Sequence, residues 1–399
     1  MFILKAWGCR LFQGAFRLAL PLLPYREPTT LPTCGALPEI LRRERSSSVL
    51  IVTDGGIVRN GLLAPVETAL RDGGIAYTVY DGTKPNPTVE NVEEALSVYL
   101  SHRCDALIAI GGGSAMDCAK AVGARVAYPK RSVSRMRGVL RILRRLPLLI
   151  AIPTTAGTGS ETTLAAVITD SALEEKYALM SFPLIPHYAV LDGTLTRTLP
   201  PHLTATTGMD ALTHAVEAYI GRSTTRETRR LALSATRAIF ANVERAYTDG
   251  QDLEARNAML RAAYEAGIAF SKSYVGYVHA LAHSLGGRYG TPHGLANAVL
   301  LPHVLEGYGS RIHKKLHRLG IAAGVCDEQD SPAAGAEKFI AAIRALNGRM
   351  GIPEVLSEID SAHVGALARH AEREANPLYP VPVLMTAKEL ERFYKAISK

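Results

Sequence analysis

Side chains able to bind a metal ion stand at helical spacing in the second half of this chain. Asp210 and His214 lie four residues apart in GMDALTHAVEAY, and His279 and His283 lie four apart in YVHALAHSLGGRYGTPHGLANA. Residues four apart share one face of an α-helix, and His293 follows after a turn that contains glycine. One carboxylate and imidazoles from separate helices can surround a divalent cation. A lone histidine is usually structural, but this grouping predicts a metal site and leaves open which three histidines bind.

Two glycine-rich stretches could bind a phosphate group. Three glycines and a serine, residues 111–114, follow the apolar run DALIAI and open a helical pattern. Glycines let the backbone approach a phosphate closely, and a helix N-terminus offers unpaired N–H groups. A second polar loop, PTTAGTGSE at 153–161, also follows a strand-like run. An ordinary tight turn would explain either loop alone, and neither is the GxGxxG fingerprint. Loops that follow parallel strands nevertheless converge at one edge of a sheet, where nucleotides bind.

Asp54 ends the first strand-like run, SVLIVTD. A carboxylate in this place can accept hydrogen bonds from an adenosine ribose and would repel a 2′-phosphate, which favours NAD over NADP. A plain turn or N-cap aspartate would explain the spacing equally well.

The elements that must position these residues change character along the chain. Strand-like runs (SVLIVTD, IAYTVYDG, DALIAI, LPLLIAIP, VITD and YAVLD) alternate with helical patterns at 60–73 and 88–103 in the first half, which is typical of βαβ units and a parallel sheet. After Leu199-Pro200 helical patterns follow almost without strands. They lie at 203–220, 225–247, 252–285, 294–306, 333–348, 361–374 and 387–397. We therefore predict two domains with a ligand cleft between them.

Composition excludes several other classes of protein. The chain has 399 residues, 47% of them hydrophobic, and a net charge of +8. Seven basic residues crowd the segment 130–145, which we interpret as an amphipathic surface helix. No aromatic residues interleave these charges, so we expect no nucleic-acid partner. No run of about 20 apolar residues is present, so we expect no transmembrane segment.

The N-terminal residues and the cysteines bear on the compartment. The first 25 or so residues are basic and apolar, but Gln13 and Arg17 interrupt the apolar part and no clear cleavage site follows. We expect an amphipathic helix docked on the protein, with contact to a membrane surface as the alternative. The five cysteines are scattered and odd in number, which indicates a reducing, cytoplasmic compartment.

Four motifs together resemble the iron-containing (group III) alcohol dehydrogenases: GGGSAMDCAK, PTTAGTGSETT, GMDALTHAVEAY and VHALAHSLGGRYGTPHGLANAVLLP. The resemblance runs from about Pro28 to the C-terminus. It implies an α/β plus all-α protein of dehydroquinate synthase-like fold, with an N-terminal Rossmann-like parallel-sheet domain and a C-terminal helical metal-binding domain. The expected boundaries are an N-terminal amphipathic extension at 1–27, an NAD-binding domain at 28–200 and a helical domain at 201–399.

The resemblance also assigns roles residue by residue. The metal ligands match Asp210, His214, His279 and His293, which leaves His283 as a catalytic histidine near the substrate. Phe270 lies where the family tends to have an aromatic wall of the substrate pocket. The cofactor-binding positions match Asp54, Asn86, Gly111, Gly112, Gly113, Ser114, Asp117, Thr154, Thr155, Thr158, Thr163, Val167 and Lys176.

The activity implied by the resemblance is transfer of a hydride between NAD(H) and a small alcohol or aldehyde. A metal would polarise the substrate oxygen. An Asp-His₃ site tolerates Fe²⁺ or Zn²⁺, and the family favours iron. The apolar stretch 164–167, with Phe270, favours short-chain aliphatic substrates. The alternative is glycerol dehydrogenase-like oxidation of polyols with zinc. The family further implies a homo-oligomer, namely a dimer.

Overall fold

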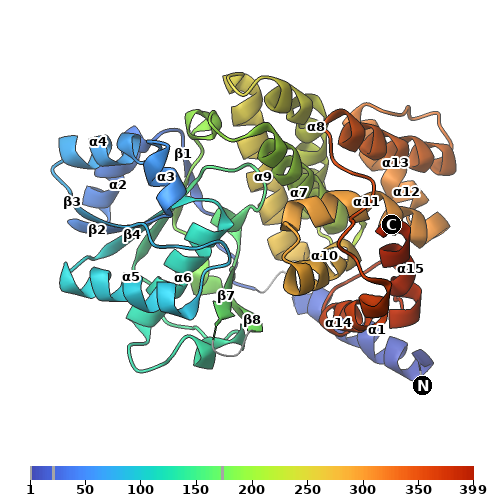
Figure 1. The fold of residues 1–399 in the computed structure, drawn as a ribbon, viewed down its shortest axis with the longest axis horizontal. Coiled ribbons are helices and arrows are strands. Elements are labelled where there is room, and N and C mark those ends of the chain that lie inside the picture. The colour runs from blue at the N-terminus through green and yellow to red at the C-terminus, as the bar shows by residue number, and fades with distance from the viewer. Residues whose placement is uncertain (1, 20–22, 172–174) are drawn as a thin grey trace. The chain divides into compact units, whose positions relative to one another are not determined.

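The computed structural model describes residues 2–19, 23–171 and 175–399, which form two compact units. One unit spans Pro24–Leu199 and carries the strands (Figure 1). The other joins the N-terminal segment, up to Leu23, to Pro200–Lys399 and is helical (Figure 1).

A six-stranded sheet forms the centre of the α/β unit. All its neighbouring strands pair in parallel, which confirms the predicted fold class. The four inner strands are apolar and almost fully buried, as expected for strands covered on both faces. In order across the sheet, the strands are β1 (Thr29–Leu31), β9 (Tyr188–Val190), β6 (Leu148–Pro153), β4 (Ala106–Gly111), β2 (Ser48–Val52) and β3 (Ala76–Tyr80).

Helices cover both faces of this sheet. Alternate residues of β2 and β4 face two separate cores, because successive side chains of a strand point to opposite faces. One face packs on α5 (Val89–Ser101) and α6 (Gly113–Ala127), and the other packs on α2 (Leu37–Arg43) and α4 (Ala64–Asp72). The short helix α3 (Gly55–Arg59) follows β2. A second, three-stranded sheet contains β5 (Gly138–Val139), β8 (Glu175–Met180) and β7 (Ala165–Asp170).

The surface helix predicted in the basic segment 130–145 is wrong. This segment contains only one 3₁₀ turn (Ser134–Met136) and β5, joined by irregular backbone. Tyr128 holds it in place, since its hydroxyl accepts hydrogen bonds from the backbone N–H groups of Leu143 and Arg144. The guanidinium of Arg131 lies 4.7 Å from the centre of the same ring. These tertiary contacts override the helical spacing of the arginines.

The second unit is helical throughout, as predicted. One expected element is wrong, because the pattern at 252–285 is two helices and not one. The chain breaks at Tyr274, where φ is +63°, and Gly276 precedes the second helix. The helices are α7 (Pro201–Ile220), α8 (Arg226–Thr248), α9 (Leu253–Ser273), α10 (Tyr277–Tyr289), α11 (His293–Tyr308), α12 (His313–Ala323), α13 (Pro332–Arg349), α14 (Val364–Ala375) and α15 (Ala387–Ile397).

The N-terminal helix α1 (Phe2–Ala19) docks on the helical unit. The Arg10 guanidinium donates to the carbonyl oxygens of Val381 and Pro382 at 2.7 and 3.0 Å. The buried amide of Gln13 donates to the carbonyl of Tyr379 at 2.7 Å. Part of the predicted extension 1–27, residues 1 and 20–22, lies outside the described residues. Across the part of the chain that the structure describes, no helix is long and apolar enough to cross a membrane.

Candidate metal centre and cofactor loops

The predicted metal ligands meet in the core of the helical unit. Asp210 and His214 lie one turn apart on α7, His279 lies on α10, and His293 opens α11. One potential ligand atom from each of the four residues lies within 4.8 Å of all the others. Asp210, His214 and His279 are buried, whereas the His293 side chain is 39% exposed. The arrangement therefore has a closed side and an open side.

Close packing between α7 and α11 sets this geometry. A Cβ at Gly294 would lie only 2.4 Å from the carbonyl oxygen of Thr206, so the N-terminus of α11 needs glycine there. The Asn297 amide, one turn further, donates to Asp210 Oδ1 at 2.7 Å and lies 3.1 Å from His293 Nε2. Asn297 thereby ties the carboxylate to the histidine of the neighbouring helix.

A buried carboxylate orients His279. Glu217 Oε2 lies 2.6 Å from His279 Nδ1 and also accepts from the backbone N–H of Gly276, while Oε1 accepts from the N–H of Val278. A Cβ at Gly276 would lie 2.6 Å from Glu217 Oε1, so glycine permits this approach. Burial raises the pKa of Glu217 to about 7, although the three hydrogen bonds oppose that shift.

The other ring nitrogen of His279 faces the cluster. This buried Nε2 has no hydrogen-bond partner among the described residues, which is unusual for a buried polar atom. Burial, reinforced by the neighbouring His214 and His293, keeps the pKa of His279 well below its usual range. Burial also lowers the pKa of His293 to about 4. Neutral imidazoles beside a carboxylate are the donor set that a divalent cation requires, so the residues present fit a metal.

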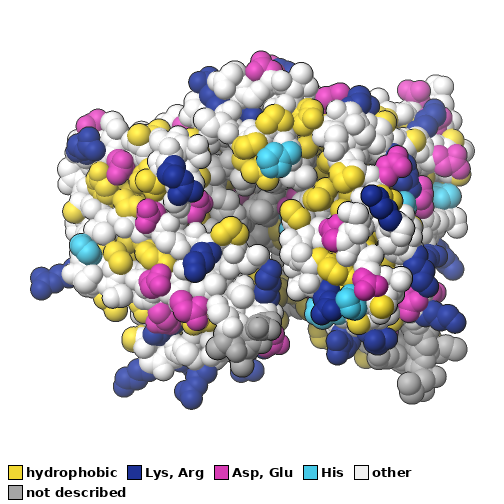
Figure 2. Space-filling view, in the orientation of Figure 1, with side chains coloured by type: hydrophobic (Ala, Val, Ile, Leu, Met, Phe, Trp, Pro, Cys, Tyr) yellow, Lys and Arg dark blue, Asp and Glu magenta, His cyan; other side chains and the backbone are white. Residues whose placement is uncertain are grey.

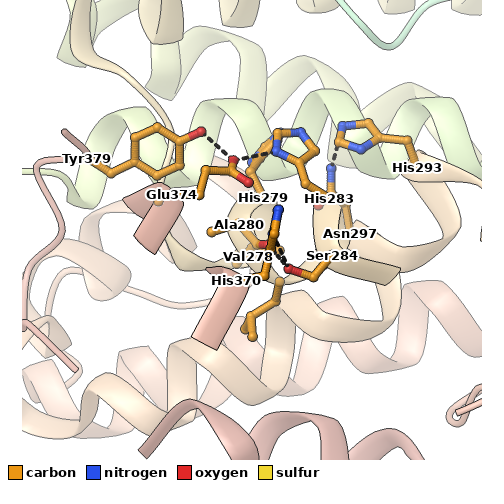
Figure 3. Close-up of polar contacts among 12 residues, drawn as sticks. Val278, His279, Ala280, His283, Ser284, His293, Asn297, His370, Glu374 and Tyr379 are labelled. Carbon is orange, nitrogen blue, oxygen red and sulfur yellow. Dashed lines mark hydrogen bonds and ion pairs between the residues drawn. The ribbon is translucent and has the colours of Figure 1, made fainter. Parts of the chain in front are cut away.

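His283 lies next to the cluster but is held by different partners. Its Nδ1 lies 2.6 Å from Glu374 Oε1, and the Tyr379 hydroxyl donates to the same oxygen at 2.7 Å (Figure 3). The His283 ring stacks on that of His293, with centroids 5.1 Å apart, and its side chain is 41% exposed. Burial alone would lower the pKa of His283, but the Glu374 carboxylate outweighs that effect and raises it.

Phe270, the predicted wall of the substrate pocket, touches the cluster directly. Its ring stacks on the His214 imidazole with centroids 4.1 Å apart and planes 15° apart. His214 in turn stacks on His279 at 4.5 Å. The aromatic contact fixes the plane of the His214 ring.

Four polar residues of this site were not predicted, namely Glu217, Asn297, Glu374 and Tyr379. Glu217 lies three residues after His214 and seven after Asp210, so helical periodicity could have placed it on the same face. Asn297 lies one helical turn after His293, so the same periodicity could have placed it beside that histidine. Glu374 lies 91 residues from His283, and nothing in the local sequence connects the two.

In the α/β unit, the two glycine-rich loops lie side by side. Gly111 and Pro153 are paired at the ends of β4 and β6, and the N–H of Thr154 donates to the carbonyl of Gly111 at 3.0 Å. Gly111 has a φ of +146°, which favours glycine. A Cβ at Gly112 would lie 3.7 Å from Thr155 Oγ1. A Cβ at Gly113 would lie 3.2 Å from Thr158 Cγ2.

Some of the predicted cofactor residues are engaged in an internal network. Asp117 accepts from the Ser160 hydroxyl at 2.9 Å and from the N–H of Val167 at 3.0 Å. The buried amine of Lys120 donates to Ser160, to Thr163 Oγ1 and to the carbonyl of Ala165. Burial lowers the pKa of Lys120 to about 8. This network fixes the second loop against α6.

The remaining predicted cofactor residues are spread around the loops. Asp54 caps α3, since its Oδ1 accepts from the N–H groups of Gly56 and Ile57, and its Oδ2 would lie 3.5 Å from a Cβ at Gly111. The Asn86 N–H donates to the hydroxyl of Ser114 at 3.3 Å. Lys176 is exposed on β8, opposite Thr169 in the second sheet.

Comparisons with known proteins agree on one family. Residues 32–193 match the model of iron-containing alcohol dehydrogenases, and residues 204–398 match the C-terminal model of the same family. The chain is 36% identical to 1,3-propanediol dehydrogenase of Klebsiella pneumoniae over 346 residues, which cover 86% of this chain and 88% of that protein. It is 37% identical to alcohol dehydrogenase 4 of Schizosaccharomyces pombe over 393 residues, or 96% and 91% of the two chains.

A solved structure adds a cofactor complex to these relatives. Sulfoacetaldehyde reductase from Bifidobacterium kashiwanohense, in complex with NAD⁺, superposes with a TM-score of 0.83 at 27% identity. The superposition covers 94% of this chain and 98% of that one.

Proposed function

The chain belongs to the iron-containing alcohol dehydrogenase family, and we propose that it transfers a hydride between NAD(H) and a short-chain alcohol or aldehyde. The single observation that carries this proposal is the group of one carboxylate and three imidazoles, three of the four residues buried, with ligand atoms within 4.8 Å of one another. The names of the relatives, an alcohol dehydrogenase and a 1,3-propanediol dehydrogenase, support a small alcohol as substrate.

We propose that Asp210, His214, His279 and His293 hold one divalent cation, with Fe²⁺ favoured by the family and Zn²⁺ compatible with the donors. A bound cation supplies Lewis acidity at the substrate oxygen, which stabilises negative charge as the alcohol loses its proton. The partly exposed His293 marks the side from which substrate would approach.

The surrounding residues hold these donors in the required state. Glu217 accepts a hydrogen bond from the Nδ1–H group of His279, so the lone pair of Nε2 stays available to bind the metal. Asn297 fixes Asp210, and Phe270 fixes the ring of His214. Because each orienting contact is buried or stacked, little reorganisation is needed when substrate binds.

We propose that His283 contacts the substrate and passes the alcohol proton to solvent. Its Nδ1 is engaged by Glu374, which leaves Nε2 to exchange a proton. Its partial exposure gives a route to water. The Tyr379 hydroxyl on the same carboxylate restricts Glu374 to one orientation.

The glycine-rich loops are the proposed cofactor site. The backbone of Gly111–Ser114 at the start of α6 would bind the pyrophosphate of NAD, with Thr154, Thr155 and Thr158 beside it. Bound NAD supplies the hydride acceptor. Asp54, close to Gly111, would repel a 2′-phosphate and so favour NAD over NADP. The NAD⁺ complex of sulfoacetaldehyde reductase supports this proposal.

We propose a homodimer, as the family implies. A reducing, cytoplasmic compartment is proposed because the five cysteines, all in the described residues, are free.

The test is a steady-state assay of the purified, Fe²⁺-loaded chain with NADH or NADPH and aldehydes of increasing length. We expect the enzyme to reduce short aldehydes with NADH. A chelator should abolish this activity, and added Fe²⁺ should restore it. Asp54→Gly should narrow the preference for NADH. A wild-type kcat/KM that favours NADPH would refute the cofactor assignment. Glycerol oxidation by the Zn²⁺-loaded chain, without aldehyde reduction by the Fe²⁺ form, would favour the polyol alternative.

A further inference from the structure

A basic pocket lies in the helical unit where α7 ends and α1 docks. Its volume is about 380 Å³, within the range of small-molecule sites. Five of its lining residues are basic and none is acidic. They come from α1, from the α7–α8 connection and from α8 and α12: Arg17, Arg222, Arg229, Lys315 and Arg318.

Two of these cations form the fixed part of the pocket. The Lys315 amine donates to the carbonyls of Ile220 and Gly221 at 2.7 and 2.8 Å, which satisfies the C-terminus of α7. The Arg229 guanidinium donates to Thr224 Oγ1 at 2.9 Å. Burial, together with the surrounding arginines, lowers the pKa of Lys315 to about 8, which reflects crowding of like charge.

The other three cations have no side-chain partner among the described residues. The side chains of Arg17, Arg222 and Arg318 are exposed and make no hydrogen bond or ion pair within the described part of the chain. Figure 2 shows the Lys and Arg side chains on one face of the molecule as scattered blue groups. Positive charges without a carboxylate repel one another, and an anion between them would offset that repulsion.

Arg17 reaches the pocket because α1 is anchored. Arg10 and Gln13 bind the backbone around Tyr379–Pro382, and Cys9 is buried against the unit. The family models begin at residue 32, so α1 lies outside them. The N-terminal segment therefore adds one cation, Arg17, to a cavity whose other lining residues lie within the matched range 204–398.

We propose that this pocket binds an anion that carries a phosphate group. Guanidinium groups bind phosphate oxygens through paired hydrogen bonds, and three unpaired arginines suit a multiply charged group better than a single carboxylate. A soluble phosphate compound and the headgroup of a lipid share this chemistry. Beside the pocket, α1 exposes Trp7, Leu11 and Leu18 to 73, 78 and 80%. Because an exposed apolar helix surface can contact a membrane, a second experiment tests a lipid headgroup as the source of the phosphate.

The experiment is calorimetric titration of the full chain with inorganic pyrophosphate at low salt. We expect a saturable phase that is weakened at least about tenfold in the double variant R222Q/R318Q, because each lost charge-assisted bond weakens binding. The matched control is R141Q/R145Q, which removes the same charge from two exposed arginines of the other unit. R17Q alone tests the contribution of α1. Thermal unfolding of every variant checks that the fold is retained.

The second arm uses vesicles of phosphatidylglycerol or phosphatidylcholine, with fluorescence of Trp7, the only tryptophan, as the readout. Binding to phosphatidylglycerol vesicles that R222Q/R318Q weakens and R141Q/R145Q does not would support the pocket and identify a lipid source. Pyrophosphate binding with the same dependence would support a soluble source. If neither probe distinguishes R222Q/R318Q from R141Q/R145Q, the proposal is wrong.

Discussion

In the helical unit the candidate metal ligands are side chains, whereas the glycine-rich loops of the α/β unit offer mainly backbone. His279 and Asp210 each have a dedicated hydrogen-bond partner, Glu217 and Asn297. Gly112 and Gly113 instead leave space in front of Thr155 and Thr158. The first site should thus be sensitive to loss of a side chain, and the second to gain of one.

Among substitutions of residues that are not themselves metal ligands, the largest effect is expected from Glu217→Gln, which keeps the size of the side chain. Glu217 accepts three hydrogen bonds, from the N–H groups of Gly276 and Val278 and from the Nδ1–H of His279. The amide of the variant would turn its NH₂ group toward at least one of these donors, and that hydrogen bond would be lost. We expect metal affinity to fall about 10- to 100-fold, as for other partners of metal-binding histidines.

Competition with a calibrated chelator measures this affinity. The matched control is Glu244→Gln, a half-exposed carboxylate that pairs with Arg349 on the surface of the same unit. If Glu217→Gln binds the metal as tightly as the control Glu244→Gln does, Glu217 does not support the metal site.

In the cofactor loops we compare one substitution that adds a side chain with one that removes a hydroxyl. Gly113→Val adds a branched side chain where even a Cβ would lie 3.2 Å from Thr158 Cγ2. Restoring the loop to its binding geometry against overpacking of this kind costs about 1–3 kcal/mol, so the Kd of NADH should rise roughly 5- to 150-fold. Ser114→Ala removes only a hydroxyl and should change the Kd of NADH by less than about threefold.

Fluorescence titration with NADH measures both variants, and the metal content of each serves as the control for the candidate metal site of the helical unit. A larger effect of Ser114→Ala than of Gly113→Val would mean that side chains and not backbone bind the cofactor.

Much of this contrast could be predicted from the sequence. The four ligands occur at spacings that a helix converts directly into one face, and the loops follow strands that pair in parallel. Glu374 could not be predicted, because only tertiary packing of α14 brings it to His283. The break at Tyr274 was missed because the helical pattern continues across it. The arginines near residue 140 looked helical, but Tyr128 fixes them in irregular backbone.

The smallest effect concerns pH and stability of the α/β unit. Burial, aided by Arg26 and Arg145, lowers the pKa of His187 to about 4, and its Nδ1 accepts from the N–H of Leu149. The unfolded chain therefore binds more protons between pH 4 and 6.5, so stability is complete above pH 6.5 and declines as the pH falls towards 4. Since the ring is partly exposed, we expect a loss of about 1–2 kcal/mol.

Denaturant unfolding at several pH values checks this dependence. His187→Asn should flatten it, whereas His102→Asn, an exposed histidine of the same unit, should leave it unchanged. A pH dependence that is identical in all three proteins would contradict the role of His187.

The central claim is that His279 binds the metal and that His283, one turn away, does not. Elemental analysis of the purified wild type, His279→Ala and His283→Ala, each loaded with Fe²⁺ and then desalted, tests it most directly. We predict one metal ion per chain in the wild type and in His283→Ala, and almost none in His279→Ala, which would lose a buried donor atom. Full occupancy in His279→Ala, or loss of metal in His283→Ala, would contradict the account.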